Sequence, residues 1–268
     1  MKILAIIGSP RKKGNTYKTV ERIKDELIGI DNTINFEYLF LADCDLKMCK
    51  GCFGCFAKGK DTCPLKDDRD MIFEKMTAAD GIILAAPTYA MGVPALMKNF
   101  IDRFAYTLHR PCFFDQSFLA VSTVGGAVGL KEALTQLALL SAGAKKSLKL
   151  GMPMPPVSMP MIENNAAKKL KKTAKAFYAS MQVNQRHQPK LVDFSYFGAF
   201  KALTRYDTYK KQCPADYQYY QEKSAYFYPV TGLRAFCGKA LAGVMKQSFK
   251  LIVKDTAGTG HTTSHAER

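Results

Sequence analysis

The first apolar run of the chain, residues 3–7, is not interrupted by polar positions. Such a run is typical of a strand buried on both faces in the middle of a parallel sheet. A polar stretch over residues 8–16 follows, in which Asn15 or Thr16 suits the N-cap of a helix. Apolar residues then recur at helical spacing over residues 20–27. The pattern predicts a strand, a short polar loop and a helix.

The same alternation of apolar runs and helical periods continues along the chain. Further strands are expected over residues 35–41, 81–86, 117–122 and 145–150. Helices are expected to begin at Asp67–Asp68 and at Pro94, and to cover residues 130–140 and 165–181. This repeated order predicts an α/β protein with a doubly wound, five-stranded parallel sheet.

Three loops with polar or glycine residues follow the predicted strands, over residues 9–16, 87–92 and 123–126. Ligands of doubly wound sheets bind at the carboxyl ends of the strands, near the point where the strand order reverses. The first loop also leads into a helix N-terminus, which attracts anions. Its spacing differs from G-x-G-x-x-G and from the Gly-Lys-Ser/Thr of a P-loop. It therefore favours a single terminal phosphate, with an ordinary strand–helix turn as the alternative.

Two segments do not belong to a minimal fold of this kind. The connection over residues 42–66 is long and has no strand or helix period, which is typical of a functional loop. Later in the chain, a Tyr-, Phe- and Lys-rich segment contains a basic amphipathic run over residues 233–245. We expect a sheet domain over residues 1–185, a mainly helical appendage over residues 186–256 and a disordered tail over residues 257–268.

Charge and hydropathy limit which partners and which cellular compartment we expect for the protein. Of 268 residues, 39 are Lys or Arg and 23 are Asp or Glu, so the formal net charge is +16 at pH 7. Most of the excess lies after residue 164, where it permits anionic partners without identifying one. No run approaches the ~20 apolar residues of a membrane span, and the first apolar run does not resemble a signal peptide. We expect a cytoplasmic protein.

The most specific signal is a cluster of cysteines. Five of the eight lie between residues 44 and 63, and four form the pattern Cys49-x2-Cys52-x2-Cys55-x7-Cys63-Pro64. Tight C-x2-C-x2-C runs bind three corners of iron–sulfur clusters, and Cys63 is placed to supply the fourth. Structural zinc is one alternative, although it usually takes two separated C-x2-C pairs. The other alternative is a redox-active dithiol or a metal-free loop. Cys44 is a spare candidate ligand.

Together these motifs give the chain a family resemblance over roughly residues 1–150. It resembles the NADPH-dependent FMN reductases of the flavodoxin-like superfamily, and among them the iron–sulfur flavoproteins. The resemblance rests on the following motifs: Gly8-Ser9-Pro10-Arg11-x2-Gly14-Asn15-Thr16, the four-cysteine run followed by Asp67-Asp68, Ala79-Asp80-Gly81-Ile82-Ile83, Pro87-Thr88-Tyr89, Lys98-x-Phe100-x-Asp102-Arg103, and Thr123-x-Gly125-Gly126.

The resemblance implies a cofactor site, residue by residue. The phosphate of FMN would be held by Ser9, Arg11, Gly14, Asn15 and Thr16. The isoalloxazine ring would be lined, largely through backbone N–H groups, by Pro87, Thr88, Tyr89, Ala90, Met91 and Gly92. Its other side would be closed by Thr123, Gly125 and Gly126. A 4Fe-4S cluster would be ligated by Cys49, Cys52, Cys55 and Cys63.

The resemblance also implies an activity. NADPH or NADH would reduce the flavin, and electrons would pass through the cluster to a small-molecule or protein acceptor. No catalytic side chain is expected, and Tyr89 either influences the flavin face or is a packed loop aromatic. Relatives are commonly dimers or tetramers, so a homo-oligomer is expected.

Three alternatives remain beside this interpretation. Reduced ferredoxin could replace the nicotinamide as donor. The protein could be a cluster-free quinone, azo or nitro reductase on the same fold. It could also be an electron-transfer flavoprotein that docks on an anionic membrane surface through its basic C-terminal segment. No nucleic-acid-binding motif is present in the sequence.

Overall fold

The computed structural model describes residues 1–126, 128–157, 159–183, 191–222, 232, 235–241, 243–244 and 247. It divides into two compact units, Met1–Cys55 with Lys60–His187 and Phe56–Gly59 with Gln188–Arg268. Several expectations lie outside the described residues. They are the boundaries after residues 185 and 256, the tail over residues 257–268 and much of the amphipathic run over residues 233–245.

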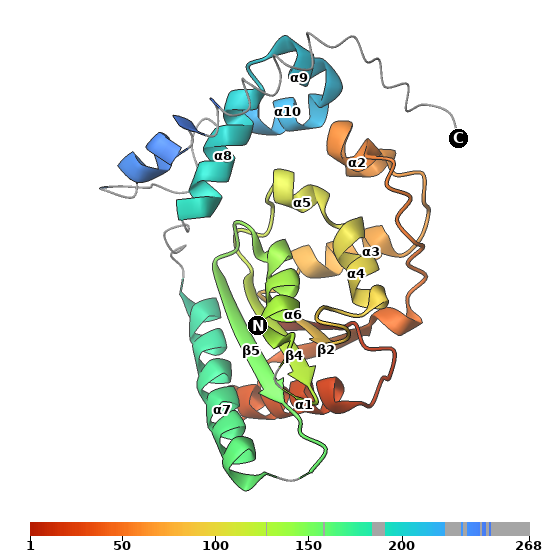
Figure 1. Cartoon of the computed structure of the whole chain (residues 1–268), viewed down its shortest axis with the longest axis vertical. Coiled ribbons are helices and arrows are strands. Elements are labelled where there is room, and N and C mark those ends of the chain that lie inside the picture. Colours follow the sequence, from red (N-terminus) through yellow and green to blue (C-terminus); the bar gives the residue numbers. More distant parts are fainter. Residues whose placement is uncertain are drawn as a thin grey trace. The chain divides into compact units, whose positions relative to one another are not determined.

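The first unit is built on a five-stranded parallel sheet (Figure 1). Its strands are β1 (Lys2–Ile7), β2 (Asn35–Phe40), β3 (Gly81–Pro87), β4 (Ser117–Val124) and β5 (Lys146–Pro153). They lie in the order β2-β1-β3-β4-β5, and every neighbouring pair is parallel. This is the flavodoxin-like order, in which the strand order reverses between β1 and β3. The predicted fold class is confirmed.

Helices cover both faces of this sheet. They are α1 (Asn15–Ile28), α3 (Arg69–Thr77), α4 (Ala95–Arg103), α5 (Tyr106–His109), α6 (Leu130–Leu137) and α7 (Pro160–Gln182). Helices α1 and α7 pack on the face that carries Ile3, Ala5 and Ile7 of β1, while α3, α4 and α6 pack on the opposite face. Figure 1 shows α7 running alongside β5. Because both faces are covered, β1 and β3 have no solvent-facing polar positions, which explains their uninterrupted apolar runs.

Some element boundaries differ from the predictions. Strand β5 continues to Pro153, because its last residues pair with the end of β4. Helix α7 begins at Pro160, five residues earlier than expected, since proline fits the first turn of a helix. The cysteine loop over residues 42–66 contains a short helix, α2 (Gly54–Ala57), and the 3-10 turn Lys60–Thr62, where no helix was expected.

The second unit is helical in its described part, which confirms the expected helical C-terminal region. It contains α8 (Leu191–Leu203), α9 (Asp207–Gln212) and α10 (Pro214–Glu222). The buried ring of Tyr220 packs against Phe197 at 5.3 Å between centroids. The hydroxyl of Tyr209 donates a 2.7 Å hydrogen bond to the fully buried carboxylate of Asp216. None of the helices in the described residues is both long and apolar enough to cross a membrane.

Candidate functional site

Three loops gather at one edge of the sheet. Strands β1, β3 and β4 are adjacent and parallel, so the segments that follow them leave the sheet on the same side. Backbone hydrogen bonds join neighbouring segments: the Gly8 N–H donates to the Ala85 carbonyl and the Thr88 N–H donates to the Thr123 carbonyl, both at 2.8 Å. The predicted cofactor loops are therefore brought together.

The loop after β1 is closed by its own polar groups. The buried Ser9 hydroxyl accepts a hydrogen bond from the Arg11 N–H at 3.2 Å and donates to the Arg11 carbonyl at 3.0 Å. The expected N-cap at Asn15 or Thr16 is wrong, because Gly14 occupies that position and no side chain caps α1. An uncapped first turn presents backbone N–H groups to an anion. The side chains of Arg11 and Asn15 are exposed beside it.

A buried pair of hydroxyl groups links this loop to β4. The Oγ1 atoms of Thr16 and Thr123 lie 2.8 Å apart, and both residues are at least 96% buried. A hydroxyl group has one donor hydrogen, so one of the pair donates to the other and the second keeps its hydrogen for a further acceptor. The sequence identified both threonines but not their contact, since they are 107 residues apart.

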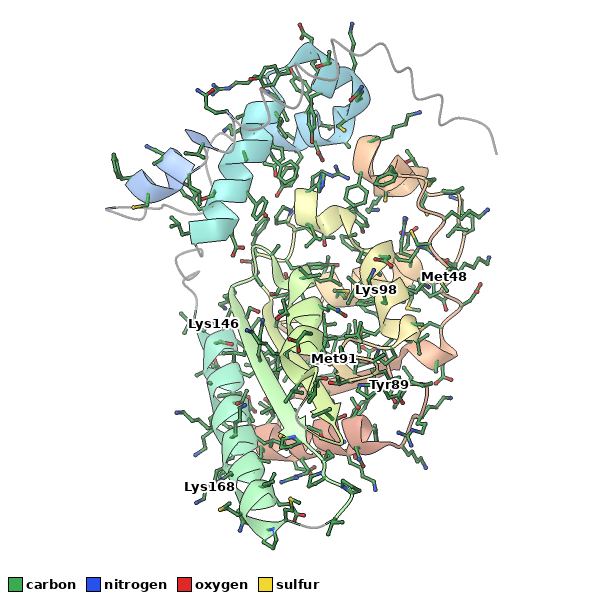
Figure 2. All side chains as sticks on the ribbon, in the orientation of Figure 1. Met48, Tyr89, Met91, Lys98, Lys146 and Lys168 are labelled. Atoms are coloured by element: carbon green, nitrogen blue, oxygen red, sulfur yellow. The ribbon has the colours of Figure 1, made fainter. Side chains whose placement is uncertain are left out.

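The loop after β3 is a tight turn in a strained conformation. Tyr89 and Gly92 exchange backbone hydrogen bonds of 2.8 and 2.9 Å. The two residues between them have positive φ, 45° at Ala90 and 66° at Met91, which is uncommon for residues other than glycine and is found often at functional sites. The side chains of Tyr89 and Met91 are 40% and 51% exposed on this turn (Figure 2). They offer an apolar surface to a flat ligand.

Gly129 supports this turn and was missed from the sequence. Its φ is +82°, and a Cβ atom there would lie 2.8 Å from the Cα of Met91. Only glycine lets the backbone approach the turn so closely. By contrast, Gly125 and Gly126 are exposed and face open space.

A cavity of about 440 Å³ lies between α1, the end of β5 and α7, where Asn15, Met152, Met154 and Asn164 line it. Among its described lining residues, Asn15 is the one predicted cofactor residue, so this cavity lies beside the three loops and is not formed by them. The phosphate of FMN fits the uncapped first turn of α1 and the spare hydroxyl hydrogen of the Thr16–Thr123 pair. The planar ring of FMN fits the exposed apolar turn at Tyr89 and Met91. Pro87 is buried under the turn, and Thr88 bonds to Ser122 at 3.0 Å.

The predicted metal ligands lie on one loop but are not gathered. Cys49 and Cys52 are exposed, whereas Cys55 and Cys63 are half-buried. Among the residues that the structure describes, no three His, Cys, Asp or Glu side chains are close enough to hold a metal ion. The Cys44 thiol instead lies 3.4 Å from the Phe40 carbonyl. Elsewhere, burial raises the pKa of Cys112 to about 12, as expected for a packing cysteine.

A buried ion pair holds the carboxyl-terminal end of this loop. The side chains of Arg103 of α4 and Asp67 are both almost fully buried, and the guanidinium contacts both carboxylate oxygens. Burial alone would raise the pKa of Asp67. Hydrogen bonds from Arg103 and from the N–H groups of Arg69 and Lys47 outweigh it and lower the pKa below its usual value.

Comparisons with known proteins agree with this geometry. The sequence model of the NADPH-dependent FMN reductase family matches residues 1–164. An iron-sulfur flavoprotein of Methanocaldococcus jannaschii is 41% identical over 130 residues, which cover 48% of this chain and 62% of that protein. An iron-sulfur flavoprotein of Clostridioides difficile is 28% identical over 211 residues, which cover 76% of this chain and 90% of that protein.

Solved structures show the same fold at low identity. An azoreductase from Bacillus anthracis has a TM-score of 0.54 at 16% identity, covering 66% of this chain and all of that one. A flavone reductase has a TM-score of 0.53 at 16% identity, covering 71% of this chain and 66% of that one. The chain spans 48% to 64% of the length of several curated relatives that it matches.

The Asp67–Arg103 ion pair predicts a pH dependence of stability. Replacing Asp67 with Asn leaves a buried guanidinium without its partner, so we expect a loss of about 3–5 kcal/mol at pH 7. Because the folded-state pKa of Asp67 is lowered, its contribution is present above the unfolded value of about 3.9 and is lost as pH falls through the folded pKa. Urea unfolding of wild type and D67N between pH 7 and pH 3 measures this.

The control is D43N, which removes an exposed ion pair with Lys12 and should cost less than about 1 kcal/mol. A D67N variant as stable as wild type at pH 7 would contradict the assignment. So would a difference between the two proteins that does not narrow towards pH 3.

Proposed function

The chain belongs to the NADPH-dependent FMN reductase family, and from this premise we propose that it is an FMN-dependent NAD(P)H oxidoreductase. The observation that carries the proposal is the meeting of an uncapped α1 with the Thr16–Thr123 hydroxyl pair at the reversal of strand order. An anionic group bound there meets backbone N–H groups, a hydroxyl donor and the nearby charge of Arg11.

Each loop has a separate task in this proposal. The phosphate is bound by the loop that contains Ser9, Arg11, Gly14, Asn15 and Thr16. The ring lies along the turn that contains Pro87, Thr88, Tyr89, Ala90, Met91 and Gly92. The opposite side is closed by Thr123, Gly125 and Gly126. Bound FMN supplies hydride acceptance from a reduced nicotinamide and release of single electrons.

The protein's own groups orient and shield the ring. The positive φ values of Ala90 and Met91 fix the turn, and Gly129 packs under it. Tyr89 and Met91 then cover part of the ring and exclude water from that face, which strengthens polar contacts nearby. No side chain needs to act as a general acid or base, so the role of these residues is positioning.

We further propose that Cys49, Cys52, Cys55 and Cys63 ligate a 4Fe-4S cluster. Support comes from their spacing and from similarity to several proteins named iron-sulfur flavoprotein. The thiols must draw together to do so, and the loop has backbone suited to tight curvature at Gly51 (φ +64°) and Gly59 (φ +105°). A cluster held there would take up and release single electrons for a small-molecule or protein acceptor.

Anaerobic reduction tests the oxidoreductase. We expect NADPH, NADH or both to abolish the absorbance of oxidised flavin in the FMN-loaded protein, because a reduced nicotinamide is the hydride donor of the proposed reaction. Reduced ferredoxin and dithionite serve as comparison donors. If dithionite reduces the flavin and neither nicotinamide does, the reductase proposal fails and a ferredoxin-fed electron carrier replaces it.

Metal analysis tests the cluster. Anaerobically purified protein should contain about four iron and four sulfide per chain, and C63S should lose most of both. C213S, which alters a half-buried cysteine of the second unit, should keep them. Zinc in place of iron contradicts the cluster. Flavin without any metal favours a cluster-free quinone, azo or nitro reductase.

A further inference from the structure

The turn over residues 89–92 depends on contacts from outside itself. Its two central residues, Ala90 and Met91, have positive φ, a conformation that residues other than glycine keep only when the surrounding structure imposes it. The two hydrogen bonds between Tyr89 and Gly92 close the turn, but they join only residues of the turn. Its position therefore depends on what holds its two ends.

Strand β4 holds the start of the turn. The Thr88 N–H donates to the Thr123 carbonyl at 2.8 Å, and the hydroxyl oxygens of Thr88 and Ser122 lie 3.0 Å apart. The fully buried Ser122 hydroxyl also donates to the Ala86 carbonyl at 3.0 Å. Because Ser122 uses its one hydrogen on Ala86, Thr88 donates to Ser122. The residue before the turn is thus fixed to the sheet.

Gln136 of α6 holds the other end of the turn. Its Oε1 accepts a hydrogen bond from the Val93 N–H at 3.1 Å. Its amide also lies so close to Gly92 that a Cβ atom there would be 3.2 Å from both Oε1 and Nε2. Among the described residues, no other side chain hydrogen-bonds to the backbone of residues 89–93. Gln136 is half-buried, so this bond is partly shielded from competing water.

Helix α6 is a firm support for this contact. Its residues Ala133 and Leu137 have no exposed surface. Gly129, at its N-cap, approaches the turn so closely that a Cβ atom would lie 2.8 Å from the Cα of Met91, and Figure 2 shows Met91 beside α6. The helix therefore contacts the turn at two points, through the backbone of Gly129 and through the side chain of Gln136.

We propose that Gln136 is a positioning residue for the isoalloxazine ring of FMN, acting through the Val93 N–H on the turn that carries Tyr89 and Met91. The inference rests on the proposed function, since it takes this turn as the surface along which the ring lies. The bond restricts the turn to one arrangement, so less conformational entropy is lost when the ring binds. The effect needs no contact between Gln136 and the flavin.

The test measures binding of FMN and of riboflavin, which has the same ring but no phosphate, to the full chain by fluorescence quenching. Q136M keeps the length of the side chain but has no amide oxygen to accept from the Val93 N–H. It should bind both flavins about fivefold more weakly than wild type, the effect of losing a hydrogen bond of about 1 kcal/mol. The factor should be the same for both, because the turn meets the ring and not the phosphate. Amide hydrogen exchange at Val93 should become faster.

Three further variants separate the hydrogen bond from other effects of the substitution. Q136E keeps an oxygen acceptor at the same place and should bind both flavins like wild type. Q136N keeps the amide but is one methylene shorter, so it should lose affinity as Q136M does. T135V, the control, removes an exposed hydroxyl on the same helix that donates to the Lys131 carbonyl, and it should match wild type.

Circular dichroism shows whether each variant is folded. Unchanged affinity in folded Q136M, with faster exchange at Val93, means that Gln136 only packs α6 against the turn and overturns the proposal. A loss for FMN without one for riboflavin overturns it too, as does a Q136E variant that binds as weakly as Q136M. Wild type that binds FMN with no measurable affinity for riboflavin also overturns the proposal and leaves the proposed function standing. Wild type that binds neither flavin contradicts the proposed function itself.

Discussion

The parallel pairing of β3 between β1 and β4 determines where every part of the candidate site lies. Because the three strands point the same way, the loops that follow them emerge at one edge of the sheet. The strand order reverses between β1 and β3, and in sheets of this kind ligands bind at the carboxyl ends of the strands beside that reversal. The hydroxyl pair of Thr16 and Thr123 and the strained turn at Ala90 and Met91 both occupy this edge.

The cysteine loop depends on the same framework through α4. It has few buried apolar residues of its own, so its anchors are polar: the Asp67–Arg103 ion pair and the hydrogen bonds of Asn99. Buried polar contacts of this kind give little net stability but specify one arrangement when all partners are satisfied. The candidate cofactor edge is therefore built on the rigid sheet, whereas the cysteine loop is held mainly by polar contacts to α4.

Much of the fold could be predicted from the sequence because it follows from periodicity. Uninterrupted runs such as residues 3–7 mark strands covered on both faces, and turn residues mark their carboxyl ends. Single residues whose role depends on distant contacts could not be predicted. Gly129 matters because Met91 approaches it, and Asn99 matters because the loop over residues 46–49 lies against it. The N-cap of α1 is Gly14 and not Asn15, because the Gly14 N–H bonds to the Arg11 carbonyl and this closes the loop one residue earlier. The importance of Asn99 could have been suspected from the sequence, because it is a polar residue on the inward face of α4.

The central claim is that the edge formed by the first and third loops binds the phosphate of FMN, and affinity measured by quenching of FMN fluorescence tests it directly. T16V keeps the shape of the side chain and removes the hydroxyl that bonds Thr123. A hydrogen bond to a charged group is worth about 1.5–3 kcal/mol, so T16V should bind FMN roughly ten- to a hundredfold more weakly. T173V, which removes a hydroxyl on α7 that donates to the Lys169 carbonyl, should bind like wild type. Equal affinity in folded T16V and wild type would contradict the account.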